Sequence, residues 1–178
     1  MVEFRPERIL AVLAEHGVDY VMIGGLAAAL HGSDMVTTDL DITPASGEDN
    51  LERLSAALRS LRARIRSDGL PDGLVFSHDG SSLANADVWN LVTDFGDLDI
   101  CFVPSGTKGF IDLRRRAVVI DVLGTTTHVA SLPDIIRSKA AAGRPKDQIA
   151  VPVLRRLLAE VERRRRSDER GAIEDTAL

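Results

Sequence analysis

The sequence has few of the features that mark secreted or membrane-spanning proteins. Cys101 is its only cysteine, so no disulfide can form within the chain. No apolar run approaches the roughly 20 residues that a membrane-spanning helix needs. The first residues lead directly into an amphipathic helix pattern, so no signal peptide is expected. These absences together predict a cytoplasmic protein that does not bind a membrane.

The chain also lacks an excess of positive charge. Its 22 lysines and arginines are outnumbered by 27 aspartates and glutamates, which gives a formal net charge of -5 at pH 7. Such a balance exerts no general attraction on nucleic acid. Arginines do cluster at residues 114–116 and 163–166. Runs of this kind are most often solvated helix surface, so charge alone identifies no partner.

The apolar content is sufficient for one folded domain. Apolar residues make up 44% of the 178 positions, which argues for a hydrophobic core and against disorder. The chain contains no internal repeat and no second core. We therefore predict a single domain over residues 1–166, with a core at about 18–130 and a helical part at about 131–166. Residues 167–178 are interpreted as a polar tail.

Apolar periodicity and turn residues predict a succession of helices and strands. Helix patterns occupy residues 5–16, 26–31, 46–61, 109–116, 131–142 and 148–166. Strand patterns occupy residues 20–23, 38–43, 88–92, 98–103, 118–123 and 127–130. Residues 67–86 are rich in Gly, Asp and Ser, which predicts a loop with one short strand at 74–76. The order predicts a mixed sheet flanked by helices, in the α/β or α+β class, with helices at the C-terminal end.

Two glycines follow the first predicted strand. Gly24-Gly25 lies between that strand and a helix, where the backbone can approach a phosphate closely. A helix N-terminus at this point also offers unpaired N–H groups. Glycines here are, by themselves, typical of a plain strand-to-helix turn. Only acidic residues further along the chain favour a phosphate site.

Asp39 and Asp41 alternate with apolar residues on the next predicted strand. Because they are two residues apart, both side chains leave the same face of the strand. Two carboxylates on one face, close to a phosphate-binding turn, suit a hard divalent cation such as Mg²⁺. The alternation alone is also typical of a half-exposed strand.

Asp99 supplies a third carboxylate. It stands inside an otherwise apolar strand, where a carboxylate is unfavourable unless it is paired or bound to a metal. Asp97 lies on the same face two residues earlier and is the competing candidate. We favour Asp99, because Asp97 directly follows Gly96 and lies nearer to the exposed end of the strand.

This pattern resembles the nucleotidyltransferase superfamily related to DNA polymerase beta. Its motif is an apolar residue, Gly-Gly or Gly-Ser, a spacer of this length, Asp-x-Asp, and a later Asp on a neighbouring strand. A second resemblance, to the AbiEii-type toxin nucleotidyltransferases, rests on distal motifs that run Lys, a short spacer, Arg, and then Arg-x-Lys-Asp. The matching residues here are Lys139, Arg144, Lys146 and Asp147. The resemblance covers about residues 18–158.

The resemblance implies the nucleotidyltransferase fold and a two-metal catalytic centre. The metal ligands would be Asp39, Asp41 and Asp99. They would bind Mg²⁺, or Mn²⁺ in its place, with a nucleoside triphosphate (NTP) as substrate. One ion would carry the triphosphate, and the second would lower the pKa of the acceptor hydroxyl. The residues implied to be catalytic are Asp39, Asp41, Asp99, Lys139 and Asp147.

The resemblance also assigns residues to the substrates. The implied substrate-binding residues are Gly24, Gly25, Ser33, Thr37, Arg144 and Lys146. The two glycines and Ser33 would contact phosphates. Lys139 and Arg144 would neutralise the triphosphate, as positive groups do in phosphoryl transfer generally. Lys146 and Asp147 would position the nucleotide or the acceptor.

The acceptor is the least constrained part of this interpretation. AbiEii-type relatives add a nucleotide to RNA, commonly a tRNA 3′ end, and are usually neutralised by a separate antitoxin protein. Relatives often carry Arg four residues before the first aspartate, where this chain has Met35, which leaves substrate contacts at that edge open. Two alternatives remain. One is an aminoglycoside-type nucleotidyltransferase that modifies a small molecule. The other is a catalytically inactive fold that only binds a nucleotide.

Overall fold

The computed structural model describes residues 3–176, with side chains described up to residue 167. The strands are β1 (Tyr20–Ile23), β2 (Asp39–Pro44), β3 (Arg64–Ser67), β4 (Leu70–Leu74), β5 (Val88–Thr93), β6 (Gly96–Cys101), β7 (Val118–Val122) and β8 (Thr125–Val129). The helices are α1 (Pro6–Glu15), α2 (Gly24–Leu30), α3 (Glu48–Ser60), α4 (Gly80–Leu83), α5 (Phe110–Arg114), α6 (Leu132–Ala142) and α7 (Pro145–Thr176).

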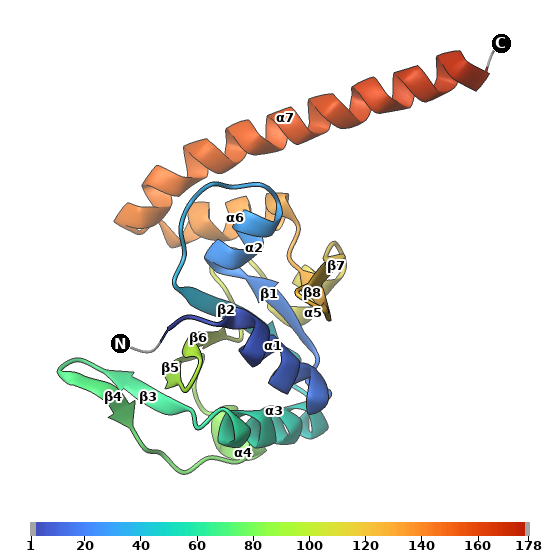
Figure 1. Ribbon diagram of the computed structural model, residues 1–178. Coiled ribbons are helices and arrows are strands. Elements are labelled where there is room, and N and C mark those ends of the chain that lie inside the picture. Colours follow the sequence, from blue (N-terminus) through green and yellow to red (C-terminus); the bar gives the residue numbers. More distant parts are fainter. Residues whose placement is uncertain (1–2, 177–178) are drawn as a thin grey trace.

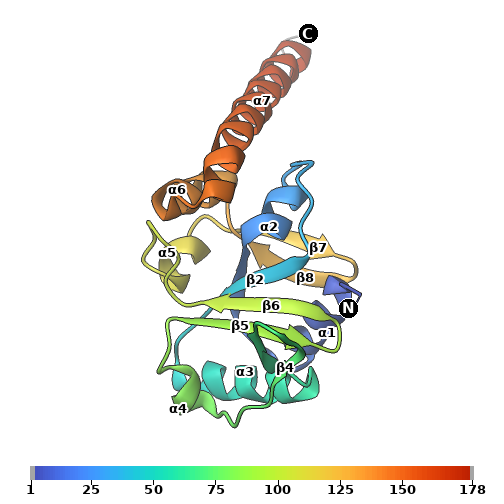
Figure 2. The same cartoon turned by 90° about the vertical axis from the view of Figure 1, so that its left-hand side faces the viewer.

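All eight strands form one mixed sheet, in the order β4-β3-β5-β6-β2-β1-β8-β7. The pairs β2–β6 and β1–β8 are parallel, and the other neighbours are antiparallel. Helices flank this sheet, and α6 and α7 close the chain (Figures 1 and 2). The predicted class, a mixed sheet flanked by helices with C-terminal helices, is confirmed.

A large part of the hydrophobic core lies on the side of the central strands that α1 and α3 cover. Leu40 and Ile42 of β2 and their neighbours Leu98 and Ile100 of β6 are all fully buried in the main apolar cluster. The same cluster contains the buried faces of α1 and α3, which lie together beneath the central strands in Figure 1. Because side chains alternate along a strand, the aspartates between these apolar residues face the opposite side.

The expectation of a loop over residues 67–86 is wrong. A β3–β4 hairpin and the short helix α4 occupy much of this region. The expected strand at 74–76 is also displaced, since β4 ends at Leu74. Gly69 and Gly73 have positive φ angles of 80° and 68°, which the turn and an irregular edge strand exploit. The hairpin is polar because it lies at the sheet edge, where much of its surface is exposed.

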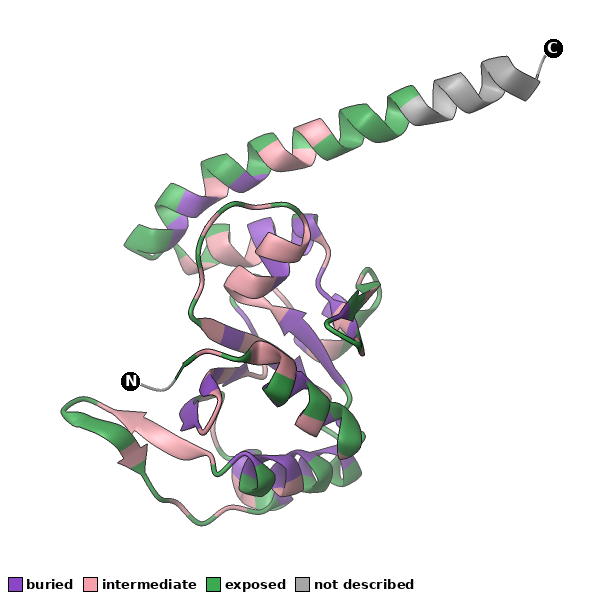
Figure 3. Ribbon diagram, in the orientation of Figure 1, coloured by how far each residue is buried: buried purple, intermediate pink, exposed green. Residues whose placement is uncertain are grey.

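The last helix, α7, projects away from the rest of the molecule (Figures 1 and 3). Its first turns are anchored by Ala150 and Leu154, which are buried, whereas residues 161–167 are exposed. The helix continues through most of the segment interpreted as a polar tail, and residues 177–178 lie outside the described residues. No helix within residues 3–176 combines the length and apolarity needed to cross a membrane.

Candidate functional site

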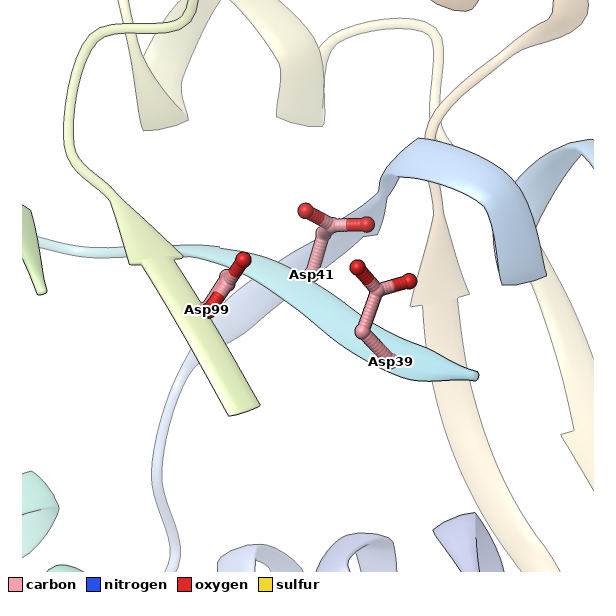
Figure 4. A group of neighbouring side chains, drawn as sticks. All are labelled: Asp39, Asp41 and Asp99. Atoms are coloured by element: carbon pink, nitrogen blue, oxygen red, sulfur yellow. The ribbon is translucent and has the colours of Figure 1, made fainter. Parts of the chain in front are cut away.

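Parallel pairing of β2 with β6 brings the predicted acidic residues together. Asp41 lies opposite Asp99 in the register, and Asp39 lies opposite Asp97. Figure 4 shows the carboxylates of Asp39, Asp41 and Asp99 projecting from these strands toward the same space. One oxygen from each of the three can be chosen so that all lie within 4.8 Å of one another. We call these three residues the acid trio.

This geometry favours Asp99 over Asp97 as the third member. Asp99 faces Asp41 across the strand pair and meets the distance condition for a shared cation. Asp97 lies further toward the start of β6, opposite Asp39, and is not part of the group that meets this distance condition. A donor set of three carboxylate oxygens suits Mg²⁺ or Mn²⁺, so the residues present fit the metal that the fold implies.

The acid trio is electrostatically crowded. Burial, followed by the charges of Asp39 and Asp99, raises the pKa of Asp41 to about 6, against a backbone hydrogen bond from Gly25 and the charge of Lys139. Burial likewise raises the pKa of Asp99 above its usual value. Both shifts have the causes expected of converging, partly desolvated carboxylates. A cation bound among the three carboxylates would stabilise their ionised forms and so lower these pKa values.

The Gly24-Gly25 turn lies directly against the acid trio. A Cβ atom on Gly24, whose φ is +73°, would come within 1.9 Å of Oδ2 of Asp41. A Cβ atom on Gly25 would come within 2.6 Å of Oγ1 of Thr37. Both positions therefore require glycine for this close approach. Thr37 in turn donates a hydrogen bond of 2.6 Å from Oγ1 to Asp39 Oδ1, so it orients one of the three carboxylates.

A cavity of about 330 Å³ opens beside the acid trio. Its polar lining includes Gly24, Asp41, Asn90, Asp99, Lys139 and Arg144. Its apolar wall includes Ile23, Val88, Leu113, Ala130 and Ile135. The cavity thus brings Gly24, Asp41 and Asp99 together with two positively charged side chains, Lys139 and Arg144, from the C-terminal helical part. A mostly apolar hollow with a few convergent polar groups is the usual form of a small-ligand site.

Asp147 organises the cations at one end of this cavity. Its side chain is 1% exposed, and its Oδ2 accepts a hydrogen bond of 2.6 Å from Arg144 Nε. Lys139 Nζ lies 3.4 Å from Asp147 Oδ1. Burial would raise the pKa of Asp147, but these two cations outweigh it and hold the pKa below its usual value. We call Lys139, Arg144 and Asp147 the cation cluster.

Helix α6, which carries Lys139, is held by a second buried carboxylate. Asp134 is fully buried and pairs with Arg116 and, at 2.9 Å, with Arg137. Ser131 caps the helix, since its Oγ accepts a hydrogen bond from the Asp134 backbone N–H. This network fixes the start of α6 and thereby the direction in which Lys139 reaches the cavity.

The remaining predicted substrate residues lie away from the cavity. Among the residues that the structure describes, Ser33 and Lys146 are outside the cavity lining. Ser33 Oγ instead accepts a hydrogen bond of 3.3 Å from the backbone of Met35. Lys146 is exposed at the start of α7. Their assigned substrate contacts therefore stay predictions.

Several polar residues at the site were missed from the sequence, among them Asn90 and Arg66. Asn90 of β5 lies opposite Asp99 in the register and lines the cavity. Arg66 of β3 pairs with both Asp97 and Asp99. The alternation of arginine and isoleucine at residues 64–66 was a signal for a strand with both arginines on one face.

Comparison with known proteins gives matches at the level of structure. No family model matches the chain, and a search of curated proteins also finds no match. A Thermotoga maritima protein assigned as a nucleotidyltransferase aligns with a TM-score of 0.51 at 20% identity, over 89% of this chain and 97% of that chain. The lincosamide antibiotic adenylyltransferase LnuA, solved with lincomycin bound, aligns with a TM-score of 0.56 at 14% identity, over 85% and 95% of the two chains.

The antibiotic-resistance factor ANT(2")-Ia, solved in complex with adenylyl-2"-tobramycin, is a third structural neighbour. It aligns with a TM-score of 0.53 at 17% identity, over 97% of each chain. At such identities the likeness concerns the fold. The chain therefore has the nucleotidyltransferase fold predicted from its motifs.

Proposed function

We propose that the protein is a metal-dependent nucleotidyltransferase, which transfers a nucleoside monophosphate from an NTP to a hydroxyl group. The observation that carries this proposal is the acid trio, in which one oxygen from each carboxylate lies within 4.8 Å of the other two, beside a cavity lined by Lys139. A module that only bound nucleotide would have no need for three converging carboxylates. Their mutual repulsion, visible in the raised pKa of Asp41, would be unfavourable without a cation.

In this proposal the acid trio binds Mg²⁺, or Mn²⁺ in its place. Two bound cations would polarise the α-phosphate, lower the pKa of the acceptor hydroxyl and align it for in-line attack. The acceptor oxygen forms a bond to the α-phosphorus while the bond from that phosphorus to the bridging oxygen breaks. Pyrophosphate then leaves, and the hydroxyl proton passes to Asp99 or to solvent.

Other residues of the chain would bind and orient the NTP. The Gly24-Gly25 turn allows the phosphates to approach the acid trio, because a side chain at either position would fill that space. Lys139 and Arg144 face the cavity and would neutralise the triphosphate. Asp147 would hold the side chains of Lys139 and Arg144 in position. Thr37 would hold the Asp39 carboxylate in its orientation.

For the acceptor we propose RNA, with a tRNA 3′ end as the first candidate. The support is the match of Lys139, Arg144, Lys146 and Asp147 to the distal AbiEii-type motifs. Lys139 and Arg144 also line the cavity, and Asp147 pairs with both of them. A toxin role, with a separate antitoxin protein that neutralises it, would accompany that acceptor.

A small-molecule acceptor is the second candidate. LnuA, a lincosamide antibiotic adenylyltransferase, and ANT(2")-Ia, solved with adenylyl-2"-tobramycin, share this fold over nearly their whole lengths. An antibiotic hydroxyl would require the same acid trio and cavity. The Met35 position, where relatives carry arginine, is compatible with an acceptor that lacks phosphates.

The test is a transfer assay with each α-labelled NTP and Mg²⁺, run with total RNA in one arm and with aminoglycosides and lincosamides in the other. Label on RNA supports the first acceptor, and label on an antibiotic supports the second. Asp41→Asn should abolish transfer, because it removes a metal ligand without changing shape. Asp72→Asn, at an exposed position on β4, is the matched control and should leave transfer unchanged. Transfer that survives Asp41→Asn would contradict the metal centre.

A further inference from the structure

Arg66 makes the closest contact between the acid trio and any cation of the described chain. Its two terminal nitrogens bond separate carboxylates, Nη1 to Asp97 Oδ2 and Nη2 to Asp99 Oδ1. Asp99 is the third member of the acid trio, so one of its two oxygens is already occupied by a guanidinium. Asp39 and Asp41 have no such ion pair among the described residues.

The position of Arg66 argues against a role in nucleotide binding. Asp99 lies between two hollows: it lines the main cavity beside Asp41 and Lys139, and it bonds Arg66 on its other side. Arg66 lines a separate, shallow hollow with Asp97 and residues 67–71 of the hairpin turn. Its positive charge therefore approaches the acid trio from the side opposite to the cation cluster.

A purely structural role would also explain little. The side chain of Arg66 is 35% exposed and that of Asp97 is 36% exposed. Ion pairs with this exposure contribute little to stability. The hairpin that carries Arg66 is also tied to the sheet by backbone pairing of β3 with β5, independently of the arginine.

We infer that Arg66 is a positioning residue which shares Asp99 with the metal centre and weakens the binding of a divalent cation to the nucleotide-free protein. The inference rests on the proposed function. Arg66 neutralises Asp99 while the site is empty, and its charge opposes an incoming cation. The ion would then bind well only with the added negative charge of a triphosphate. Arg66 would thus couple metal occupancy to the presence of substrate.

The experiment measures Mn²⁺ binding to the protein alone, by the electron paramagnetic resonance signal of free Mn²⁺. Arg66→Gln keeps a polar, shorter side chain and removes its charge. It should bind Mn²⁺ about tenfold more tightly than the wild type, as expected for a unit charge removed from the neighbourhood of a divalent ion in a solvent-screened site. Arg66→Lys keeps the charge and should stay near the wild-type affinity.

Arg64→Gln is the matched control. Arg64 lies two residues away on the same strand and face, but it pairs with Asp94 at 3.5 Å rather than with the acid trio. Its replacement should change the Mn²⁺ affinity by less than about twofold, because the lost charge is distant and screened. Thermal unfolding of all variants checks that the fold is retained.

The outcomes separate this inference from the proposed function. If the wild type binds Mn²⁺ and Arg66→Gln binds it equally or more weakly, the inference is overturned while the metal centre stands. If neither protein binds Mn²⁺ alone but both bind it in the presence of a non-hydrolysable NTP, the inference is overturned and the metal centre stands. If neither binds Mn²⁺ under either condition, both are overturned. Binding that is detected only in Arg66→Gln, or that is clearly tighter there and unchanged in Arg64→Gln, supports the inference.

Discussion

Two groups of charged residues flank the acid trio, and they are built in opposite ways. In the cation cluster, one buried carboxylate holds two cations: Asp147 is 1% exposed and bonds both Arg144 and Lys139. On the other flank, one half-exposed cation holds two carboxylates, since Arg66 bonds Asp97 and Asp99. The difference distinguishes ion pairs built around a buried carboxylate from ion pairs built around a half-exposed cation.

The direction of each pKa shift expresses the same contrast. The cations around Asp147 outweigh its burial and lower its pKa, so this carboxylate is ionised and satisfied within the protein. For Asp99, burial outweighs the contact with Arg66 and its pKa is raised. A carboxylate whose charge is fully compensated within the protein can hold two helices together. One whose charge is only partly compensated can still bind a metal ion.

The largest expected effect on stability comes from removing the buried anchor. Asp147→Ala leaves Lys139 and Arg144 without their carboxylate and breaks the link between α6 and α7. It should reduce the free energy of unfolding by about 2–4 kcal/mol, somewhat less than for a fully buried pair that loses one partner, because the Arg144 side chain is 57% exposed. Urea unfolding followed by the fluorescence of Trp89, the single tryptophan, measures this.

Glu160→Ala is the control on the same helix. Glu160 pairs with Arg164 one turn further along α7, and both side chains are largely exposed. Loss of this pair should change the free energy of unfolding by less than about 1 kcal/mol. If both variants lost the same free energy of unfolding, Asp147 would stabilise the fold no more than the partly exposed Glu160 does.

The pH dependence of stability sharpens the contrast between Asp41 and Asp147. The folded state raises the pKa of Asp41 from 3.8 to about 6, so its contribution is favourable at low pH and is lost as the pH rises through about 6. In metal-free buffer, Asp41→Asn should therefore be more stable than the wild type above that pH, by about 3 kcal/mol. The difference should vanish near pH 4.

Asp147→Asn should show the reverse dependence. Its pKa is lowered in the folded state, so its stabilising contribution is present above its usual pKa and is lost as the pH falls through the folded value. The variant should thus be clearly less stable than the wild type at neutral pH and approach it in acid. If the stability of Asp41→Asn and of Asp147→Asn, each relative to the wild type, changed with pH in the same direction, the distinction between Asp147 as an anchor and Asp41 as a metal ligand would be contradicted.

The acid trio and its strands were predictable because their signal is local. Alternation of aspartate with leucine and isoleucine along β2 and β6 specifies both the strands and the faces of their side chains. The choice of Asp99 over Asp97 also followed from position along one strand. A glycine pair at a fixed distance before Asp39 completed a motif that the fold bears out.

The β3–β4 hairpin was not predictable in the same way. Its residues are polar and glycine-rich, and its strand character depends on pairing of β3 with β5, more than twenty residues further along the chain. Arg66 meets Asp97 and Asp99 only through that pairing. Composition indicates a loop at such an edge, because the energy that orders it comes from tertiary contacts rather than local propensity.

The smallest expected effect on stability comes from the half-exposed ion pair between Arg66 and Asp97. Asp97→Asn removes the charge of one partner of Arg66, in a pair whose side chains are 35% and 36% exposed. The free energy of unfolding should fall by less than about 1 kcal/mol and should lose part of its dependence on salt concentration, since surface pairs are weak and screened. If the free energy of unfolding fell as much as in Asp147→Ala under the same conditions, the ion pairs of Arg66 would stabilise the fold as strongly as those of Asp147. Arg66 would then belong to the fold rather than to an exchange with metal.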